Sequence, residues 1–221
     1  MFCVARSTNP LLFAPKSRSQ TRSDRGELES WRKECDCYSM SPRIVDLSKA
    51  GPERLQAAVR KVIEGQSVGG RLREGALSVA AEGEGAEARY FQSILELGYL
   101  VASADGLAEE EKNALADLLE QVTGKAIDHS QLKLHFQDLE DACQALGRKE
   151  RLRRAAADFE DAIGRTEALS FAALVAVADG EIGDAELGAL AELGKHLELD
   201  AAQVDRAVDG VVRDLELTLG S

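Results

Sequence analysis

The sequence predicts an all-α fold: a compact helical bundle of about seven or eight helices built from two pseudo-repeats. From Pro52 onward, apolar residues recur at the spacing of one helix face. Runs of β-branched residues with strand-like alternation are missing, so no candidate sheet is predicted. One helix–loop–helix pattern also occurs twice, about 74 residues apart, which indicates an internal duplication.

Composition and charge limit the classes of function. The chain has 221 residues, 44% of them hydrophobic, and a formal net charge of −12. The acidic balance argues against a nucleic-acid partner, which requires a basic face. No stretch approaches the roughly 20 apolar residues of a membrane-spanning helix, and four cysteines are too few for a disulfide scaffold. We therefore expect a soluble, cytoplasmic protein with a protein partner.

The N-terminal residues 1–47 are predicted to be a disordered or dispensable tail. All four prolines fall within the first 52 residues, which carry a net charge of +3, whereas the rest of the chain carries −15. The tail is also rich in Ser and Arg and lacks apolar periodicity, as is typical of segments without a core. One interpretation is that Met40 begins the natural protein, so that residues 1–39 are dispensable.

Residues 48–85 are predicted to form one helix followed by a connector. The helix begins at Pro52, because proline needs no hydrogen-bond partner in the first helical turn. Gly65 ends it. Five glycines lie between residues 66 and 85, which predicts a loose, glycine-rich connector containing at most one short helix.

Residues 86–221 are predicted to be the main all-α domain. Repeat one covers about 88–146 and contains three helices with apolar stripes at i, i+3, i+4 and i+7. A linker helix with a basic start is expected over 148–163. Repeat two covers about 165–217 and is expected to reproduce the helices of repeat one.

The duplication is visible in three landmarks that occur in the same order. Leu-Val-Ala-Ser-Ala-Asp-Gly at 100–106 matches Leu-Val-Ala-Val-Ala-Asp-Gly at 174–180. Downstream, Glu111 matches Glu186, and an Asp-x-x-Gln pattern that begins at Asp128 recurs in the second copy. An Asp-Gly pair after an apolar helix is a typical helix stop. Glu or Gln three residues after a helix-capping position is typical of a capping box.

This pattern resembles the TerB-like tellurite-resistance family: a helix ending in Ala-Asp-Gly, a short loop, a Glu that opens the next helix, and a second copy. The resemblance covers about residues 89–217. It implies a compact all-helical protein with pseudo-repeats, linked to tellurite resistance and stress responses. It also implies that acidic loop residues bind a divalent metal, which by position are Asp105 and Glu111 in the first copy and Asp179 and Glu186 in the second.

The first copy departs from the family pattern, since Glu111 follows Asp105 by six residues instead of seven. Lys112 occupies the seventh place, and a cation there weakens the case for a metal at the first loop. Carboxylates suit Ca²⁺ or Mg²⁺, but Ca²⁺ requires six to eight oxygens, so two side chains predict only weak binding. Acids in a first helical turn also stabilise a helix by about 0.3–1 kcal/mol each without any metal. Both interpretations stay open at this point.

The sequence contains no catalytic or cofactor-binding motif that we could identify. The three histidines, His129, His135 and His196, lack the spacing of a shared metal site, and His196 is expected at the surface near a helix end. We therefore expect a non-enzymatic protein that holds a divalent cation weakly in its acidic loops and docks a partner through its helical surface. The alternative is a helical protein–protein interaction scaffold without metal.

Overall fold

The computed structural model describes residues 45–220, so the predictions for residues 1–44, including a start at Met40, lie outside the described residues. Within this part the chain forms nine α-helices, two short 3₁₀ helices and one pair of two-residue strands. The predicted all-α fold class is confirmed. Across residues 45–220, no helix combines the length and apolar character needed to cross a membrane.

The nine α-helices follow one another with short connections. They are α2 Pro52–Gly65, α3 Ser67–Ala80, α4 Ala86–Ala102, α5 Glu109–Val122, α6 His129–Leu146, α7 Arg148–Ala156, α8 Ala162–Ala176, α9 Asp184–His196 and α10 Ala201–Gly220.

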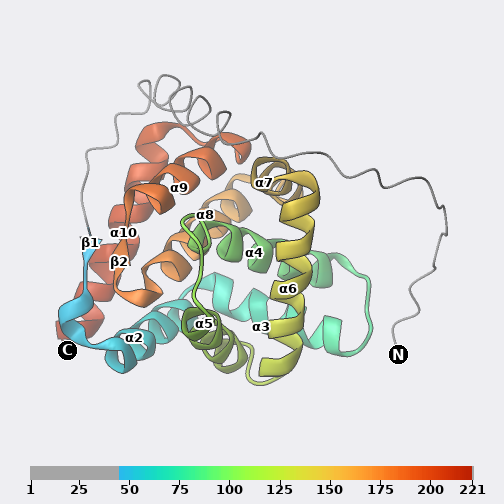
Figure 1. The fold of residues 1–221 in the computed structure, drawn as a ribbon, viewed down its shortest axis with the longest axis horizontal. Helices are drawn as coiled ribbons and strands as arrows, with labels where there is room; N and C mark the ends of the chain where they lie inside the picture. Colours follow the sequence, from blue (N-terminus) through green and yellow to red (C-terminus); the bar gives the residue numbers. More distant parts are fainter. Residues whose placement is uncertain (1–44, 221) are drawn as a thin grey trace, which may run out of the picture. The chain divides into compact units, whose positions relative to one another are not determined.

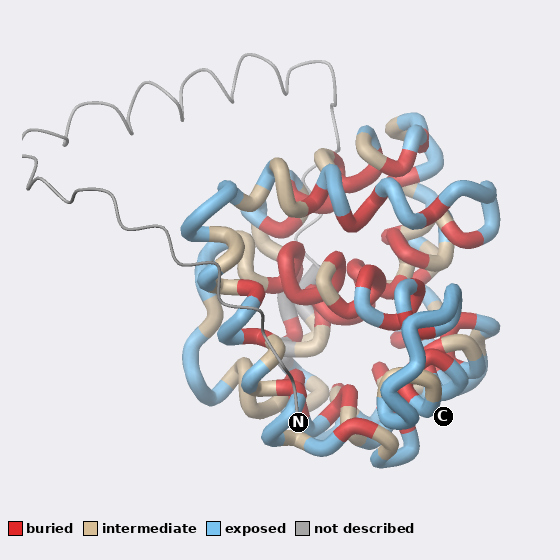
Figure 2. The backbone as a smooth tube through the Cα atoms, turned by 90° about the vertical axis from the view of Figure 1, so that its right-hand side faces the viewer, coloured by how far each residue is buried: buried red, intermediate tan, exposed pale blue. Residues whose placement is uncertain are grey.

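The predicted duplication corresponds to α4–α5–α6 and α8–α9–α10, with α7 between them. The two equivalent first helices, α4 and α8, pack against each other at the centre, and the other helices surround them (Figure 1). A Cβ on Gly98 of α4 would lie 2.9 Å from the Phe171 ring and 3.2 Å from Val175, both on α8. Glycine therefore lets the two helices approach closely. Buried residues gather on the inward-facing turns, and exposed residues on the outer ones (Figure 2).

The predicted loose connector is wrong, because residues 67–80 form α3, a regular helix of 14 residues. Its glycines serve close packing. A Cβ on Gly69 would lie 2.3 Å from the Ile63 carbonyl oxygen, and one on Gly75 would lie 2.6 Å from the Glu87 carbonyl oxygen. Real Cβ atoms do not approach backbone so closely, so only glycine fits at both positions. α3 also brings the described helices above the seven or eight expected.

The predicted linker helix is too long, since α7 ends at Ala156 and a new helix, α8, begins at Ala162. Asp161 fixes the start of α8. Its carboxylate Oδ1 accepts a hydrogen bond of 2.7 Å from the backbone N–H of Gly164, which caps the first turn of α8.

A small β-pair was also missed by the sequence prediction. β1 (Val45–Asp46) pairs antiparallel with β2 (Glu181–Ile182), and the Leu47 N–H donates a bond of 2.7 Å to the Gly180 carbonyl oxygen. These strands are too short to show the two-residue alternation on which strand prediction relies. Residues 45–47, predicted to be tail, therefore belong to the folded part.

Candidate binding cavity between the repeats

The first repeat places its predicted acids on the loop between α4 and α5. Gly106 has a φ of 103°, a left-handed conformation that glycine adopts readily and that turns the chain toward α5. Glu111 is the third residue of α5, and its Oε2 accepts a bond of 2.7 Å from the Ala108 N–H. This bond satisfies a backbone donor that the helix leaves unpaired. Asp105 lies in the loop itself and is exposed.

The second repeat reproduces this arrangement between α8 and α9. Gly180 has a φ of 112° and makes the equivalent turn. Glu186 is the third residue of α9, and its Oε2 accepts a bond of 2.8 Å from the Gly183 N–H, as the capping-box prediction requires. Glu186 is only 6% exposed. The side chain of Asp179 lies outside the described residues.

Glu111 and Glu186 line the same cavity, although they are far apart in the sequence. The cavity measures about 290 Å³ and lies where the ends of α4 and α8 meet the starts of α2, α5 and α9. Asp105 does not line it. Most of the wall consists of apolar side chains, and the polar lining is three glutamates and one glutamine. The lining residues are Pro52, Gln56, Ala102, Leu107, Glu110, Glu111, Ala114, Leu115, Val175, Ala176, Ala178 and Glu186.

The sequence indicated the two glutamates but not the cavity that they share. Their convergence depends on the packing of α4 against α8, which no local pattern reports. The contribution of α2, through Pro52 and Gln56, was missed for the same reason. One pattern in the sequence could have indicated this packing: small residues alternate before each Asp-Gly pair. Short side chains there let the ends of the two helices come together.

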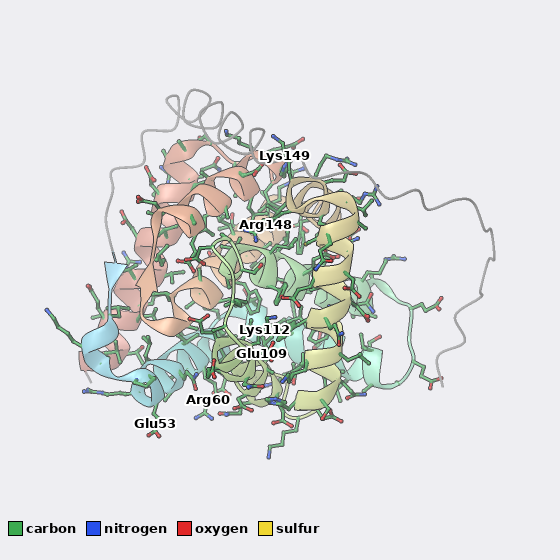
Figure 3. The ribbon with its side chains drawn as sticks, viewed as in Figure 1. Glu53, Arg60, Glu109, Lys112, Arg148 and Lys149 are labelled. Atoms are coloured by element: carbon green, nitrogen blue, oxygen red, sulfur yellow. The ribbon has the colours of Figure 1, made fainter. Side chains whose placement is uncertain are left out.

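Lys112, expected to weaken a metal site at the first loop, points away from the cavity. Its Nζ lies 2.6 Å from a carboxylate oxygen of Glu140 on α6 and 3.4 Å from one of Glu109 (Figure 3). The hydrogen bond that Lys112 donates to Glu140 raises the pKa of Lys112, so this side chain stays charged. These three residues line a separate hollow between α5 and α6. Lys112 therefore does not neutralise the glutamates of the cavity.

The carboxylates of the cavity fit a divalent cation only as a partial ligand set. Glu111 and Glu186 could offer at most four oxygens, and one oxygen of each already accepts a backbone N–H. Glu110, the third glutamate of the lining, could offer at most two more. Among the side chains that the structure describes, no group of three or more His, Cys, Asp or Glu residues could hold a metal ion. A cation here would need backbone carbonyls and water for the rest of its shell.

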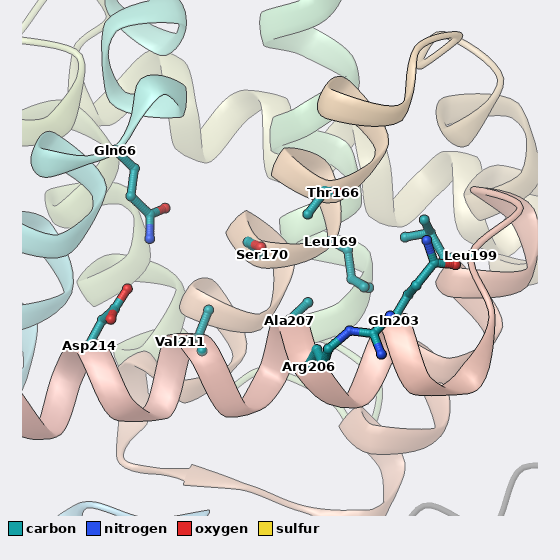
Figure 4. Close-up of a pocket in the computed structure, with 11 residues that line it drawn as sticks. Gln66, Thr166, Leu169, Ser170, Leu199, Gln203, Arg206, Ala207, Val211 and Asp214 are labelled. Carbon is teal, nitrogen blue, oxygen red and sulfur yellow. The ribbon is translucent and has the colours of Figure 1, made fainter.

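A third hollow, of about 380 Å³, lies between α8 and α10 (Figure 4). Gln66 and Asp214 lie at one end of it and Gln203 and Arg206 at the other, with Ser170 of α8 between them. This hollow contains none of the predicted site residues, so it is separate from the cavity between the repeats.

Comparison of the chain with protein-family models, curated proteins and solved structures finds no match in any of the three. The resemblance to TerB-like proteins therefore stays a prediction from the motif residues.

Proposed function

We propose that the chain is a non-enzymatic helical binding protein, similar to TerB-like proteins, that docks a protein partner at the cavity between its repeats. One observation carries the proposal: equivalent glutamates of both repeats, Glu111 and Glu186, line one cavity whose remaining walls are mostly apolar, with Glu110 and Gln56 as the other polar lining residues. A Lys or Arg side chain fits these features, because its aliphatic stem can contact the walls while its charged end meets the carboxylates. We therefore propose a partner that presents a basic side chain.

The capping bonds support this function by fixing the carboxylates before any partner arrives. Each glutamate is held at its helix start by a backbone N–H, at 2.7 Å for Glu111 and 2.8 Å for Glu186. A partner then loses little affinity to the ordering of these side chains. The net charge of −12 also favours encounters with a basic surface, since the long-range field attracts it.

A weakly held divalent cation, Ca²⁺ or Mg²⁺, is the second candidate for the same cavity. The presence of Glu111 and Glu186 in one cavity lining favours it, because a cation would relieve repulsion between carboxylates of like charge. These two residues would hold the ion. The link to tellurite resistance and stress responses rests on the family resemblance, and survival of cells without the gene on tellurite medium tests it separately.

The partner proposal is tested with n-butylguanidinium, a small mimic of an Arg side chain, titrated into the full chain and followed by NMR. We expect saturable shifts of the methyl signals of Leu107 and Leu115, and weak or no binding of the uncharged mimic n-butylurea. Glu111→Gln and Glu186→Gln remove charge but keep an oxygen that can cap, so they should weaken binding several-fold. Asp200→Asn, an equivalent change at the start of α10 and remote from the cavity, is the control and should bind normally.

Equal binding of the charged and uncharged mimics, or no binding of either, would contradict the partner proposal. Calorimetry with Ca²⁺ and Mg²⁺ on the same proteins separates the second candidate. If a cation binds the wild type, is lost in Glu186→Gln, and n-butylguanidinium does not bind, the cation replaces the partner as the occupant.

A further inference from the structure

The short helix α7 connects the two repeats and carries an unusual concentration of positive charge. It packs against α4, α6 and α9, so it contacts both repeats. Five of its first seven residues are basic: Arg148, Lys149, Arg151, Arg153 and Arg154. Figure 3 shows Lys149 at the start of this helix.

Carboxylates on three elements balance most of this charge. Within α7, Glu150 pairs with Arg153 and Arg154, and their hydrogen bonds lower its pKa to about 2. On α4, a carboxylate oxygen of Glu96 lies 2.6 Å from Arg151. On α9, Glu192 lies 3.4 Å from Lys149.

A histidine of α6, one of the helices that pack against α7, has a buried ring nitrogen. The Nε2 atom of His135 is buried and has no hydrogen-bond partner among residues 45–220. The charged groups that act on it are Arg151 of α7 and Asp138 of its own helix. Burial lowers the pKa of His135, and Arg151 lowers it further while Asp138 opposes the shift. The imidazole is thus held in its neutral form.

A second histidine lies at the end of α9, another helix that packs against α7. His196 is the last residue of α9, and its side chain is 19% exposed, so it is less exposed than the surface position expected from the sequence. Its Nε2 is buried, lacks a hydrogen-bond partner in the described part, and lies 3.9 Å from a Glu192 oxygen. Burial lowers the pKa of His196; Glu192 raises it, whereas Lys149, Arg153 and the neighbouring Lys195 lower it.

We propose that protonation of His135 and His196 releases α7 from α6 and α9, which makes the connection between the two repeats acid-sensitive. Each imidazole carries a buried Nε2 without a hydrogen-bond partner in the described residues and belongs to a helix that packs against the cationic α7. Each protonated imidazole would therefore add a positive charge to this region. On the α9 side, a charged His196 would also compete with Lys149 for Glu192. This device is independent of what occupies the cavity between the repeats.

The sign of the pH effect follows from the lowered pKa values. A histidine whose folded pKa lies below its unfolded value of about 6.5 contributes stability that is fully present above that value. This contribution is lost as the pH falls toward the folded pKa. Glu96 acts in the opposite direction, because burial raises its pKa and the folded state takes up that proton more readily. Substitution of the histidines alone therefore isolates their contribution to the pH dependence of stability.

Hydrogen exchange of the full chain at about pH 7.5 and pH 5.5 tests the proposal. We expect the protection factors of α7 amides to fall by about tenfold or more relative to those of α4 at the lower pH. The variant His135→Gln with His196→Gln stays neutral and should lose this dependence. His129→Gln is the matched control, since His129 lies 2.7 Å from Asp117 and away from α7, and it should respond like the wild type.

NMR titration of the wild-type histidines provides a readout that does not depend on how the variants fold. Both His135 and His196 should titrate below about 6.5, and the α7 amide signals should shift with the same midpoints. The proposal is overturned if either imidazole titrates at or above that value, if α7 protection does not change with pH, or if the double variant responds like the wild type.

Discussion

Gly98→Ala is expected to destabilise the fold at the crossing of the two repeats. The added Cβ would lie 2.9 Å from the Phe171 ring and 3.2 Å from Val175, whereas carbon atoms in contact prefer about 3.5–4.0 Å. Overpacking of this kind costs about 1–3 kcal/mol. Replacement of glycine by alanine within a helix otherwise stabilises the folded protein by about 0.5–1 kcal/mol. The expected net loss is therefore about 1 kcal/mol.

Gly188→Ala supplies the matched control. Gly188 lies within α9, is exposed, and an added Cβ would meet nothing within 4 Å. This variant should be more stable by about 0.5–1 kcal/mol, since alanine is favoured over glycine within a helix and the added Cβ meets no neighbour. Urea unfolding followed by circular dichroism measures both free energies. If Gly98→Ala is as stable as Gly188→Ala, the close approach of α4 and α8 is not a tight constraint, and the argument for the central crossing fails.

Three further predictions concern single side chains. Glu186→Ala should lower the free energy of unfolding in urea by about 1 kcal/mol, because the Gly183 N–H loses its acceptor. Glu186→Gln should lower it much less. Equal losses in the two variants would contradict the capping role. Asp161→Ala should lower stability, because the Gly164 N–H loses its capping acceptor. The hydrogen bonds from backbone N–H groups lower the pKa of Asp161, so the loss should be present near neutral pH and shrink below about pH 4. A loss that does not depend on pH would refute this. Arg151→Met leaves Glu96 without its ion pair. The loss of stability should be largest above the raised pKa of Glu96 and should diminish in acid as that carboxyl becomes neutral. A loss that grows in acid would contradict this expectation.

Features that depend on a few neighbouring residues were predictable from the sequence. The Asp128 carboxylate accepts the Gln131 N–H at 2.9 Å, and the Gln131 side chain accepts the Asp128 N–H at 3.0 Å. The same reciprocal bonds join Asp200 and Gln203, both at 2.8 Å. These capping boxes are confirmed, and each was predictable because a segment of four consecutive residues suffices to form it.

Features that depend on residues distant in the sequence were not predictable in this way. The glycines of α3 look like breakers locally, but the tight contact between Gly75 and the Glu87 backbone requires glycine inside a helix. Likewise, each glutamate of the cavity is recognisable as a helix cap, yet only the packing of α4 on α8 brings Glu111 and Glu186 to one place. A local sequence pattern predicts each helix cap but not which glutamate of the other repeat lines the same cavity.

The central claim is that Glu111 and Glu186 act together on a single site. It is tested most directly by measuring the affinity of n-butylguanidinium for the wild type, Glu111→Gln, Glu186→Gln and the double variant. The account predicts one binding site per chain, weaker binding in each single variant, and the weakest binding in the double variant. Undiminished binding in either single variant would show that this glutamate serves only to cap its helix, and would contradict the account.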